Sequence, residues 1–115
     1  MRNIIAGAAA SLMLAAPVTA ASFSALTSWY GPGFHGRTTA SGTVYDQWAF
    51  TAAHKTLPFG TRVRVTNPRT RESITVTITD RGPFIGAREF DLSRGAAEAV
   101  SLIHSGVAYL EYEIL

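Results

Sequence analysis

Cysteine is absent from this chain of 115 residues. Its absence excludes disulfide bonds, thiolate ligands for a metal and a lipid anchor attached to an N-terminal cysteine. A domain of this length must therefore be stabilised by its apolar core, even in a compartment where disulfides could form.

An excess of charge of one sign is also missing. Lys and Arg number 10 and Asp and Glu number 8, which gives a formal net charge of +2 at pH 7. The chain has no charge run, internal repeat or low-complexity tail that would indicate a second module. The charge balance therefore gives no indication of a nucleic-acid partner, and we expect none.

No apolar run is long enough to cross a membrane as a helix, which requires about 18 residues. The run at residues 4–16 follows a basic residue and ends at a proline, before a few small side chains. This arrangement is typical of a cleavable signal peptide. We expect residues 1–20 to be that peptide, cleaved after Ala20 with Ala21 as the second choice. Residues 21–115 would then form one soluble domain, by default a monomer, in the periplasm or outside the cell.

Several catalytic signatures are missing as well. The chain has no Gly-x-Ser-x-Gly elbow of a serine hydrolase, no His-x-His or His-Glu-x-x-His metal motif and no phosphate-binding loop. His35, Asp46, His54 and Asp80 could together ligate a metal, but their spacing matches no known metal motif. We therefore expect neither a metal nor an organic cofactor.

Strand signals come from segments that alternate polar and apolar residues. Residues 61–66 and 73–79 flank a turn of Asn, Pro, Arg and Thr, and they predict a β-hairpin. Residues 108–114 predict another strand, with two glutamates on the face opposite the apolar side chains. Residues 23–30 give a weaker signal of the same kind.

One helix is predicted from Ser93, a favourable N-cap, to Ile103, because apolar side chains recur there at spacings of three and four. Gly95 weakens this helix by about 1 kcal/mol relative to alanine, so we expect it to be short. Short strands, one short helix and turns rich in Gly and Pro indicate an all-β fold. A small closed barrel fits best, because closure removes unpaired strand edges.

Polar side chains gather next to the predicted strands, where β scaffolds usually carry their sites. Asp80 ends the most apolar strand and is followed by Arg81 and a Gly-Pro turn. Partial desolvation would favour a protonated carboxyl in this position, while the arginine would favour the ionised form. Asp80 is thus either a proton donor or a residue that caps the turn.

His54 and Asp46 form the second group of candidates. A carboxylate beside a histidine can fix the imidazole tautomer and hold the ring charged. A histidine between a strand and a Leu-Pro-Phe-Gly loop is, however, more often structural. Nearby aromatic side chains offer flat faces for sugar rings, or else they pack in the core. These aromatic residues are Trp29, Tyr30, Phe34 and Trp48.

Six short motifs of this chain occur together in the order of a known family. They are Phe-His-Gly-Arg at 34–37, Thr-Ala-Ser-Gly at 39–42, Tyr-Asp at 45–46, Thr-Ala-Ala-His-Lys-Thr-Leu-Pro-Phe-Gly-Thr at 51–61, Asp-Arg-Gly-Pro-Phe at 80–84 and Phe-Asp-Leu-Ser at 90–93. Together they resemble the rare lipoprotein A family of septal-ring lytic transglycosylases, over residues 27–115. The resemblance implies a six-stranded double-psi β-barrel with one short helix.

The same resemblance implies an enzyme that acts on peptidoglycan glycan strands. Such an enzyme cuts between N-acetylmuramic acid and N-acetylglucosamine and leaves a 1,6-anhydro end. The family's essential aspartate matches Asp80, its histidine matches His54, and Asp46 matches a third acidic position. Because the 6-hydroxyl of the muramic acid would attack its own anomeric carbon, one acid would suffice. Asp80 would protonate the leaving oxygen and then accept the hydroxyl proton, helped by a His54 that Asp46 steadies.

Other residues beside these three are expected to contact the substrate. Arg37 and Arg81 would hold polar groups of the sugar, although an ion pair with Glu89 or Asp91 is an equally ordinary role for Arg81. If His54 and Asp80 serve one reaction, their side chains should open onto a common groove. The expected substrate-binding set is completed by Tyr30, Ser41 and Thr43.

The chain also departs from the family pattern. Thr43 stands where the family often has an acidic residue, and the anchoring cysteine of many members is absent. The chain stops at residue 115, before the glycan-binding domain that many members carry. The main alternative is a non-catalytic, expansin-like module that binds wall glycan, since such proteins share a similar barrel and a motif like residues 90–93. Aspartic proteases share the barrel topology too, but the Asp-Thr/Ser-Gly tripeptide that they need does not occur.

Overall fold

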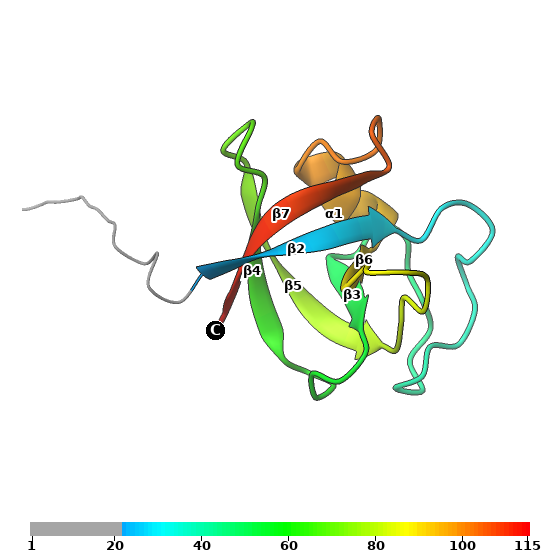
Figure 1. Ribbon diagram of the computed structural model, residues 1–115. Helices are drawn as coiled ribbons and strands as arrows, with labels where there is room; N and C mark the ends of the chain where they lie inside the picture. Colours follow the sequence, from blue (N-terminus) through cyan, green and yellow to red (C-terminus); the bar gives the residue numbers. More distant parts are fainter. Residues whose placement is uncertain (1–21) are drawn as a thin grey trace, which may run out of the picture.

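The computed structural model describes residues 22–115, in which six strands close into a barrel (Figure 1). The predicted signal peptide, residues 1–20, lies outside the described residues. Along the chain the elements are β2 (Ser22–Trp29), β3 (Thr51–His54), β4 (Arg62–Thr66), β5 (Ser73–Asp80), β6 (Phe90–Leu92), α1 (Arg94–Ala99) and β7 (Val107–Ile114).

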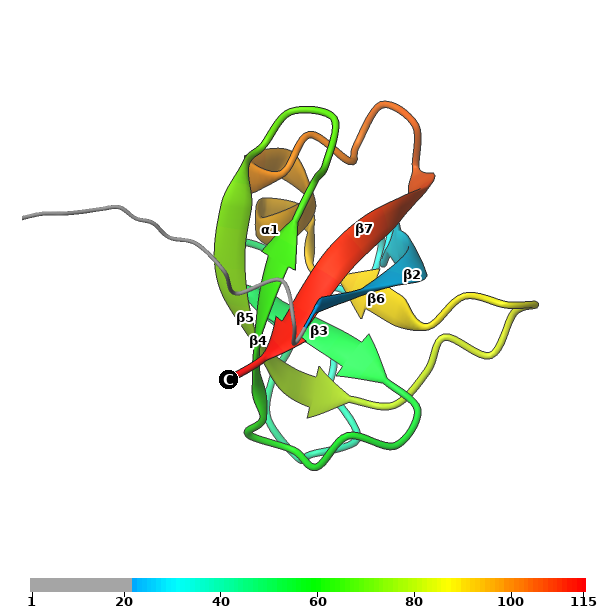
Figure 2. The same ribbon diagram turned by 60° about the vertical axis from the view of Figure 1, so that its left-hand side comes forward.

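The strands follow the order β2, β6, β3, β5, β4 and β7 around the barrel, and β7 returns to β2. The β2–β6 and β3–β5 pairs are parallel, whereas the other neighbours are antiparallel. Strands distant in sequence therefore become neighbours, and Figure 2 shows β2 beside both β7 and β6. The predicted all-β barrel with one short helix is confirmed.

The predicted hairpin is formed by β4 and β5, where Val63 lies opposite Val76. Side chains alternate between the two faces of a strand, so both valines enter the barrel while the arginines of β4 remain exposed. The C-terminal run predicted from its alternation is confirmed as β7. Its residues Leu110 and Tyr112 are buried, and Glu111 is exposed.

The centre of the core is aromatic. Tyr112 stacks on Phe90 with ring centroids 3.9 Å apart, and both rings are buried. The Thr27 hydroxyl donates to the Ala25 carbonyl oxygen at 3.0 Å and so is free to accept a hydrogen bond from the Tyr112 hydroxyl. The phenol thus has a polar partner inside the barrel, as a buried hydroxyl requires.

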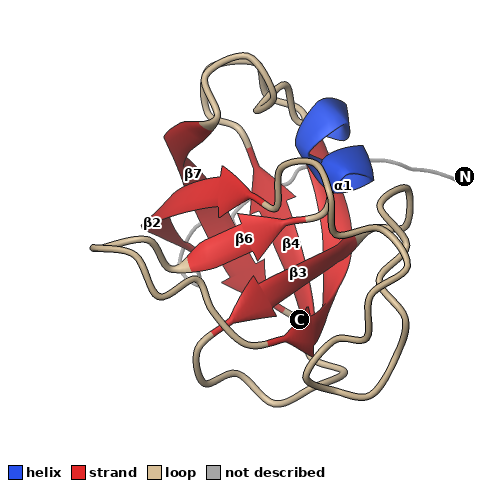
Figure 3. Ribbon diagram, turned by 90° about the vertical axis from the view of Figure 1, so that its right-hand side faces the viewer, coloured by secondary structure: helices blue, strands red, loops and turns tan. Residues whose placement is uncertain are grey.

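Helix α1 begins after Ser93, whose hydroxyl accepts a hydrogen bond from the Ala96 backbone N–H at 3.2 Å. The predicted N-cap is confirmed. The helix ends before the predicted Ile103, because Ser101 takes a left-handed conformation with φ of 59°. Figure 3 shows α1 at one end of the barrel, and Ala97 belongs to the core cluster. Within residues 22–115 no helix has the length and apolarity needed to cross a membrane.

The connection from β2 to β3, residues 30–50, is called the 30–50 loop below, and it is fastened to the barrel at several points. An isolated β-bridge joins Thr38 and Val44 within it. Its Gln47 carbonyl accepts a hydrogen bond from the Gly95 N–H at 2.7 Å. A Cβ atom on Gly95 would lie 2.5 Å from the Trp48 carbonyl oxygen, so only glycine allows this close approach. Helix α1 and the loop are therefore packed backbone to backbone.

Candidate active site

Two rows of side chains cross β6, β3 and β5 on opposite faces. Residues paired across a sheet point to the same face, and neighbours along one strand alternate. Ala52 is paired with Leu92 and Ile78, and all three side chains lie in the core. The next residue, Ala53, is paired with Asp91 and Asp80, which therefore face away from the core.

A bulge sets the direction of Asp80. The register between β3 and β5 shifts between Ala52 and Ala53, so that Asp80 rather than Thr79 lies beside Ala53. Strict alternation from the buried Ile78 would send Asp80 toward the core. The extra residue reverses this direction and aims the carboxyl at the 30–50 loop, and bulges frequently occur next to sites for this reason.

The Asp80 carboxylate accepts three hydrogen bonds. Its Oδ1 atom accepts one from the Ala40 backbone N–H at 2.8 Å and one from the Arg81 backbone N–H at 2.9 Å. Its Oδ2 atom accepts one from the Tyr30 hydroxyl at 2.7 Å. A carboxylate oxygen offers about two lone pairs, so Oδ1 is fully used while Oδ2 keeps one for another partner.

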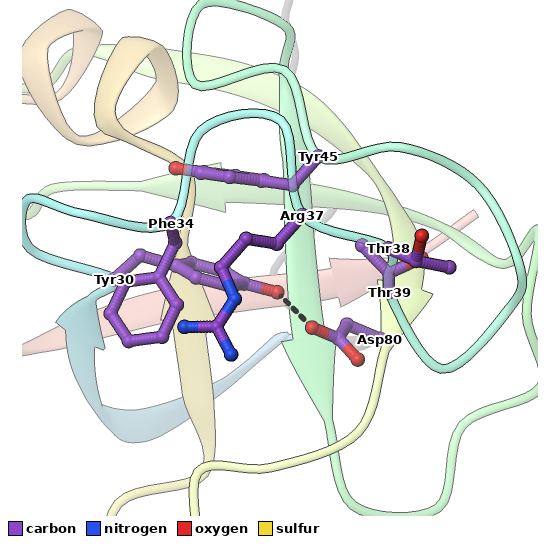
Figure 4. A pocket seen from close by; sticks show the side chains of 7 residues that line it. All are labelled: Tyr30, Phe34, Arg37, Thr38, Thr39, Tyr45 and Asp80. Carbon is purple, nitrogen blue, oxygen red and sulfur yellow. Dashed lines mark hydrogen bonds between the residues drawn. The ribbon is translucent and has the colours of Figure 1, made fainter.

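A cavity of about 200 Å³ lies between Asp80 and the 30–50 loop. Figure 4 shows its side chains, with the Tyr30–Asp80 hydrogen bond dashed. The cavity is smaller than the roughly 300–1,000 Å³ of typical small-molecule sites. It can thus enclose only a small part of an extended ligand. Its lining residues are Tyr30, Phe34, Arg37, Thr38, Thr39, Tyr45 and Asp80.

Two stacked tyrosines form one wall of this cavity. The rings of Tyr30 and Tyr45 lie 4.4 Å apart and nearly parallel. Burial raises the pKa of Tyr30, and the hydrogen bond to Asp80 raises it further. Burial also raises the pKa of Tyr45, although the Arg94 backbone N–H, which donates to the Tyr45 hydroxyl, acts in the opposite direction. Both phenols therefore stay protonated at neutral pH, and Tyr30 remains a donor to Asp80.

Arg37 lines the cavity, as expected for a residue that would hold polar groups of a sugar. Its guanidinium carbon lies 5.5 Å from the centroid of the Phe34 ring, within range of a cation–π interaction. Phe34 is 40% exposed, so part of an aromatic face is open beside the cation.

His54 does not line this cavity. By alternation it faces the side opposite Ala53, and its ring lies 4.6 Å from that of Phe90. Its Nδ1 atom accepts hydrogen bonds from the backbone N–H groups of Thr56 and Leu57 at 3.1 and 3.0 Å. The structure therefore does not show the common groove expected for His54 and Asp80.

Asp46 does not steady His54 either. Its Oδ1 atom accepts a hydrogen bond from the Trp48 backbone N–H at 2.9 Å, which closes a turn of the 30–50 loop. Burial lowers the pKa of His54, and the nearby Arg81 adds to this effect, although Glu89 opposes it. The expectation that Asp46 holds a charged His54 imidazole is wrong, since the ring is favoured in its neutral form and its Nδ1 is occupied.

Arg81 fastens the loop that follows β3. One of its guanidinium nitrogens, Nη1, donates to the carbonyl oxygens of His54 and Leu57 at 3.2 and 2.9 Å. The same guanidinium lies 4.0 Å from the centroid of the Phe59 ring. It makes no ion pair with Glu89 or Asp91 in the part of the chain that the structure describes. Arg81 thus connects His54 with Asp80: its side chain binds the His54 carbonyl, and its backbone N–H binds the Asp80 carboxylate.

Ser41 and Thr43 belong to the turn that presents Ala40 to Asp80. Their hydroxyls and that of Thr39 lie 3.0 Å from one another in each pair. Of these three residues only Thr39 lines the cavity. The hydroxyl of Thr43, where the family often has an acidic side chain, stabilises the loop here.

Of the residues that the sequence patterns proposed for the site, Asp80, Tyr30 and Arg37 line one cavity. The patterns did not identify Tyr45 as part of the cavity wall, although Tyr45 stands next to Asp46 in the Tyr-Asp motif at 45–46. They gave Asp91, which lies in the same row as Asp80, only the role of a possible ion-pair partner of Arg81. Among residues 22–115 no group of three His, Cys, Asp or Glu side chains is arranged to hold a metal ion.

The fold and this site define a double-psi β-barrel of the lytic transglycolase family. Residues 22–112 match that family, and the chain belongs to it. The resemblance to the rare lipoprotein A family is confirmed by individual relatives. The probable endolytic peptidoglycan transglycosylase RlpA of Synechocystis sp. is 58% identical over 90 residues, which are 78% of this chain and 28% of that protein. The endolytic peptidoglycan transglycosylase RlpA of Campylobacter jejuni is 50% identical over 90 residues, 78% of this chain and 33% of that protein.

The chain thus spans a third or less of the length of these two relatives. Solved structures support the fold. The Streptomyces papain inhibitor superposes with a TM-score of 0.64 at 19% identity, over 82% of this chain and 94% of that one. The apo-expansin of Clavibacter michiganensis gives 0.65 at 19% identity, over 82% of this chain and 50% of that one. At such identities the likeness concerns the fold alone.

Proposed function

We propose that this domain is an endolytic peptidoglycan lytic transglycosylase, which cleaves the bond between N-acetylmuramic acid and N-acetylglucosamine and leaves 1,6-anhydro ends. The names of its relatives support the substrate class. The observation that carries the proposal is the Asp80 carboxyl, which lines the cavity and keeps one lone pair of Oδ2 free.

The reaction needs a proton delivered to the glycosidic oxygen and a proton removed from the 6-hydroxyl. Protonated Asp80 would donate to the glycosidic oxygen as the bond from that oxygen to the anomeric carbon breaks. The 6-hydroxyl oxygen of the same muramic acid would form the new bond to the anomeric carbon, and its proton would pass to the Asp80 carboxylate. No water is consumed, so no second carboxylate is needed to activate one, in contrast to inverting glycosidases.

The cavity wall suits a sugar ring. The aromatic faces of Tyr30 and Phe34 offer apolar contact, and Arg37 offers the cation for a carboxylate or hydroxyl of the muramic acid. Tyr30 would also hold the Asp80 carboxyl in one orientation through its hydrogen bond. The small volume implies that one sugar enters while the rest of the strand lies across the surface.

His54 and Asp46 take positioning roles in this proposal. His54 holds the backbone after β3, to which the Arg81 side chain is also bonded, and the Arg81 N–H in turn binds Asp80. Asp46 closes the turn next to Tyr45 in the cavity wall. Both residues would therefore affect activity through the geometry of the site rather than by contact with the reacting atoms.

Digestion of purified sacculi tests the proposal. The wild-type domain should release fragments with anhydro ends, identified by mass, and Asp80→Asn should reduce their rate of release at least about 100-fold, as loss of a general acid does. Glu113→Gln is the matched control, because this carboxylate pairs with Arg64 at 2.7 Å and does not line the cavity. If the wild type sediments with sacculi but produces no new ends, a binding module of the expansin-like kind replaces the enzyme.

A further inference from the structure

Trp48 presents an aromatic ring that the site described above does not use. The residue is 55% exposed, although tryptophan is highly buried on average, and it does not line the cavity. The backbone on either side of it is fixed. The Gln47 carbonyl accepts a hydrogen bond from the Gly95 N–H at 2.7 Å, and the Ala49 carbonyl accepts one from the Ser93 hydroxyl at 2.6 Å. An exposed ring on a fixed backbone is preorganised to bind a ligand.

The Arg94 guanidinium lies over this ring, with its central carbon 5.4 Å from the ring centroid. Its Nε donates to the Glu98 carboxylate at 3.0 Å, and both of these side chains are exposed. Within residues 22–115 the Arg94 side chain makes no other hydrogen bond, so both Nη groups can donate to a ligand. A flat apolar face beside guanidinium donors matches a sugar ring, which has C–H faces and a rim of oxygen atoms.

Tyr45 connects this pair of side chains to the cavity. Its ring forms part of the cavity wall, and its hydroxyl accepts a hydrogen bond from the Arg94 backbone N–H at 3.2 Å. Figure 4 shows this hydroxyl at the end of the ring away from Asp80. Because the cavity of about 200 Å³ encloses only a small part of a glycan strand, the neighbouring sugars must lie on the surface beside it. One path along that surface leads over Tyr45 to Arg94 and Trp48.

We propose that Trp48 and Arg94 form a second sugar-binding subsite, which holds a sugar of the glycan strand outside the cavity while Asp80 acts on the sugar inside it. The inference rests on the proposed function, because it takes the glycan strand as the ligand. The sugar ring packs on the exposed part of the indole. The free Nη groups of Arg94 donate to oxygen atoms of the strand, among them the carboxylate of a muramic acid. Glu98, which is bonded to Nε, orients the guanidinium.

Binding of soluble, peptide-free glycan strands tests the subsite, in an Asp80→Asn background that slows cleavage. Trp48→Ala should raise the Kd for these strands roughly 3- to 10-fold, as expected for the loss of one aromatic contact. Trp48→Phe keeps a flat apolar face and should restore most of the affinity. Tyr109→Ala is the matched control, because Tyr109 is 64% exposed and does not line the cavity.

NMR locates the contact on the protein. The chain has two tryptophans, so the indole N–H signal of Trp48 is identified by its absence from the spectrum of Trp48→Phe. This signal should shift when strands are added to the Asp80→Asn protein. A Trp48 signal that does not move, or a Kd that Trp48→Ala leaves unchanged, would overturn the subsite.

Sacculus digestion gives a second readout. Trp48→Ala should raise the sacculus concentration at half-maximal rate roughly 3- to 10-fold and leave the maximal rate within about twofold, because the lost contact is made equally before and during the reaction. A lower maximal rate at an unchanged half-saturating concentration would mean that Trp48 acts through the packing of loop and helix, and the inference would be wrong. A wild type that releases no anhydro ends, while Trp48→Ala still weakens strand binding, would overturn the proposed function and retain the subsite.

Discussion

At the scale of single residues, the Tyr30 hydroxyl is the donor to Oδ2 of Asp80. Tyr30→Phe keeps the stacking on Tyr45 and removes only the donor to Asp80. A hydrogen bond to a charged group contributes about 1.5–3 kcal/mol, so we expect the rate of anhydro-end release to fall roughly 10- to 100-fold. The rate on sacculi and the thermal unfolding midpoint should be measured together.

Tyr109→Phe is the control for that substitution, because Tyr109 is 64% exposed on β7. It should change neither rate nor midpoint. A Tyr30→Phe variant with wild-type activity would show that Asp80 needs no orientation by the phenol. A large loss of thermal stability would show that the hydroxyl serves the fold instead.

His54 is expected to make the stability of the domain depend on pH. Its pKa is lowered in the folded state, so the folded protein binds a proton less readily than the unfolded chain. The stabilisation is present above the unfolded value of about 6.5 and is lost as pH falls through that value toward the folded pKa. In His54→Asn, whose amide oxygen can replace Nδ1 as an acceptor, the unfolding free energy should therefore decrease less between pH 7.5 and 5.5.

Urea denaturation at several pH values measures this difference. His104→Asn, a substitution at an exposed histidine, is the comparison for the loss of an imidazole as such. Parallel curves for wild type and His54→Asn would contradict a neutral, partly buried imidazole. A steeper loss in the variant would mean that His54 is charged in the folded protein.

At the scale of elements, the contact between α1 and the 30–50 loop is the one that a single methyl group can break. A Cβ atom in Gly95→Ala would meet the Trp48 carbonyl oxygen at 2.5 Å, so the loop or the helix must shift. Overpacking of this kind costs about 1–3 kcal/mol, which exceeds the gain of about 1 kcal/mol in helix propensity. We expect lower stability and, because the loop carries Tyr45, lower activity.

Glu98→Ala tests the helix without the clash, because Glu98 is exposed and its ion pair with Arg94 is worth little. This control should remain within about 0.5 kcal/mol of the wild type. If Gly95→Ala were as stable and active as the control, the close packing of loop and helix would be unnecessary.

The elements that sequence could predict are those with enough residues to show a period. Polar and apolar residues alternate in strands β4, β5 and β7, which are five to eight residues long. This alternation predicts the β4–β5 hairpin and the buried face of each strand. Strands β3 and β6 have four and three residues, too few for a periodic signal. Their identity as strands depends on partners distant in sequence, which only the resemblance implied.

The direction of side chains at the site was harder to predict, because it depends on a bulge and on loop conformation that no local pattern marks. The bulge beside Ala53 reverses Asp80 relative to strict alternation, and nothing local in the sequence marks the extra residue. The predicted pairing of Asp46 with His54 rests on residue types and on the family resemblance, whereas backbone N–H groups bind both side chains instead. Hydrogen bonds between a side chain and nearby backbone compete with distant partners, and their outcome depends on loop conformation.

At the scale of the whole molecule, closure of the barrel depends on the aromatic stack that spans it. Tyr112 on β7 stacks on Phe90 of β6 and shares a hydrogen bond with Thr27 of β2, so one side chain links three strands. These strands bring together residues from both ends of the domain, and none of them is long enough to be stable alone. Loss of this link should therefore destabilise the entire domain in one cooperative transition.

Tyr112→Ala should cost about 3–5 kcal/mol, as expected when a fully buried aromatic ring is removed. That cost is a large part of the roughly 5–15 kcal/mol that stabilises a typical domain, so part of the population should unfold at 37 °C. Tyr112→Phe should cost only about 1 kcal/mol, since Thr27 keeps its hydrogen bond to the Ala25 carbonyl. Urea unfolding followed by both circular dichroism and tryptophan fluorescence checks the ratio of the two costs. Trp29 and Trp48 report on β2 and the 30–50 loop, whereas circular dichroism reports on all strands. Separate transitions for the two probes would therefore mean that the strands do not unfold as one unit.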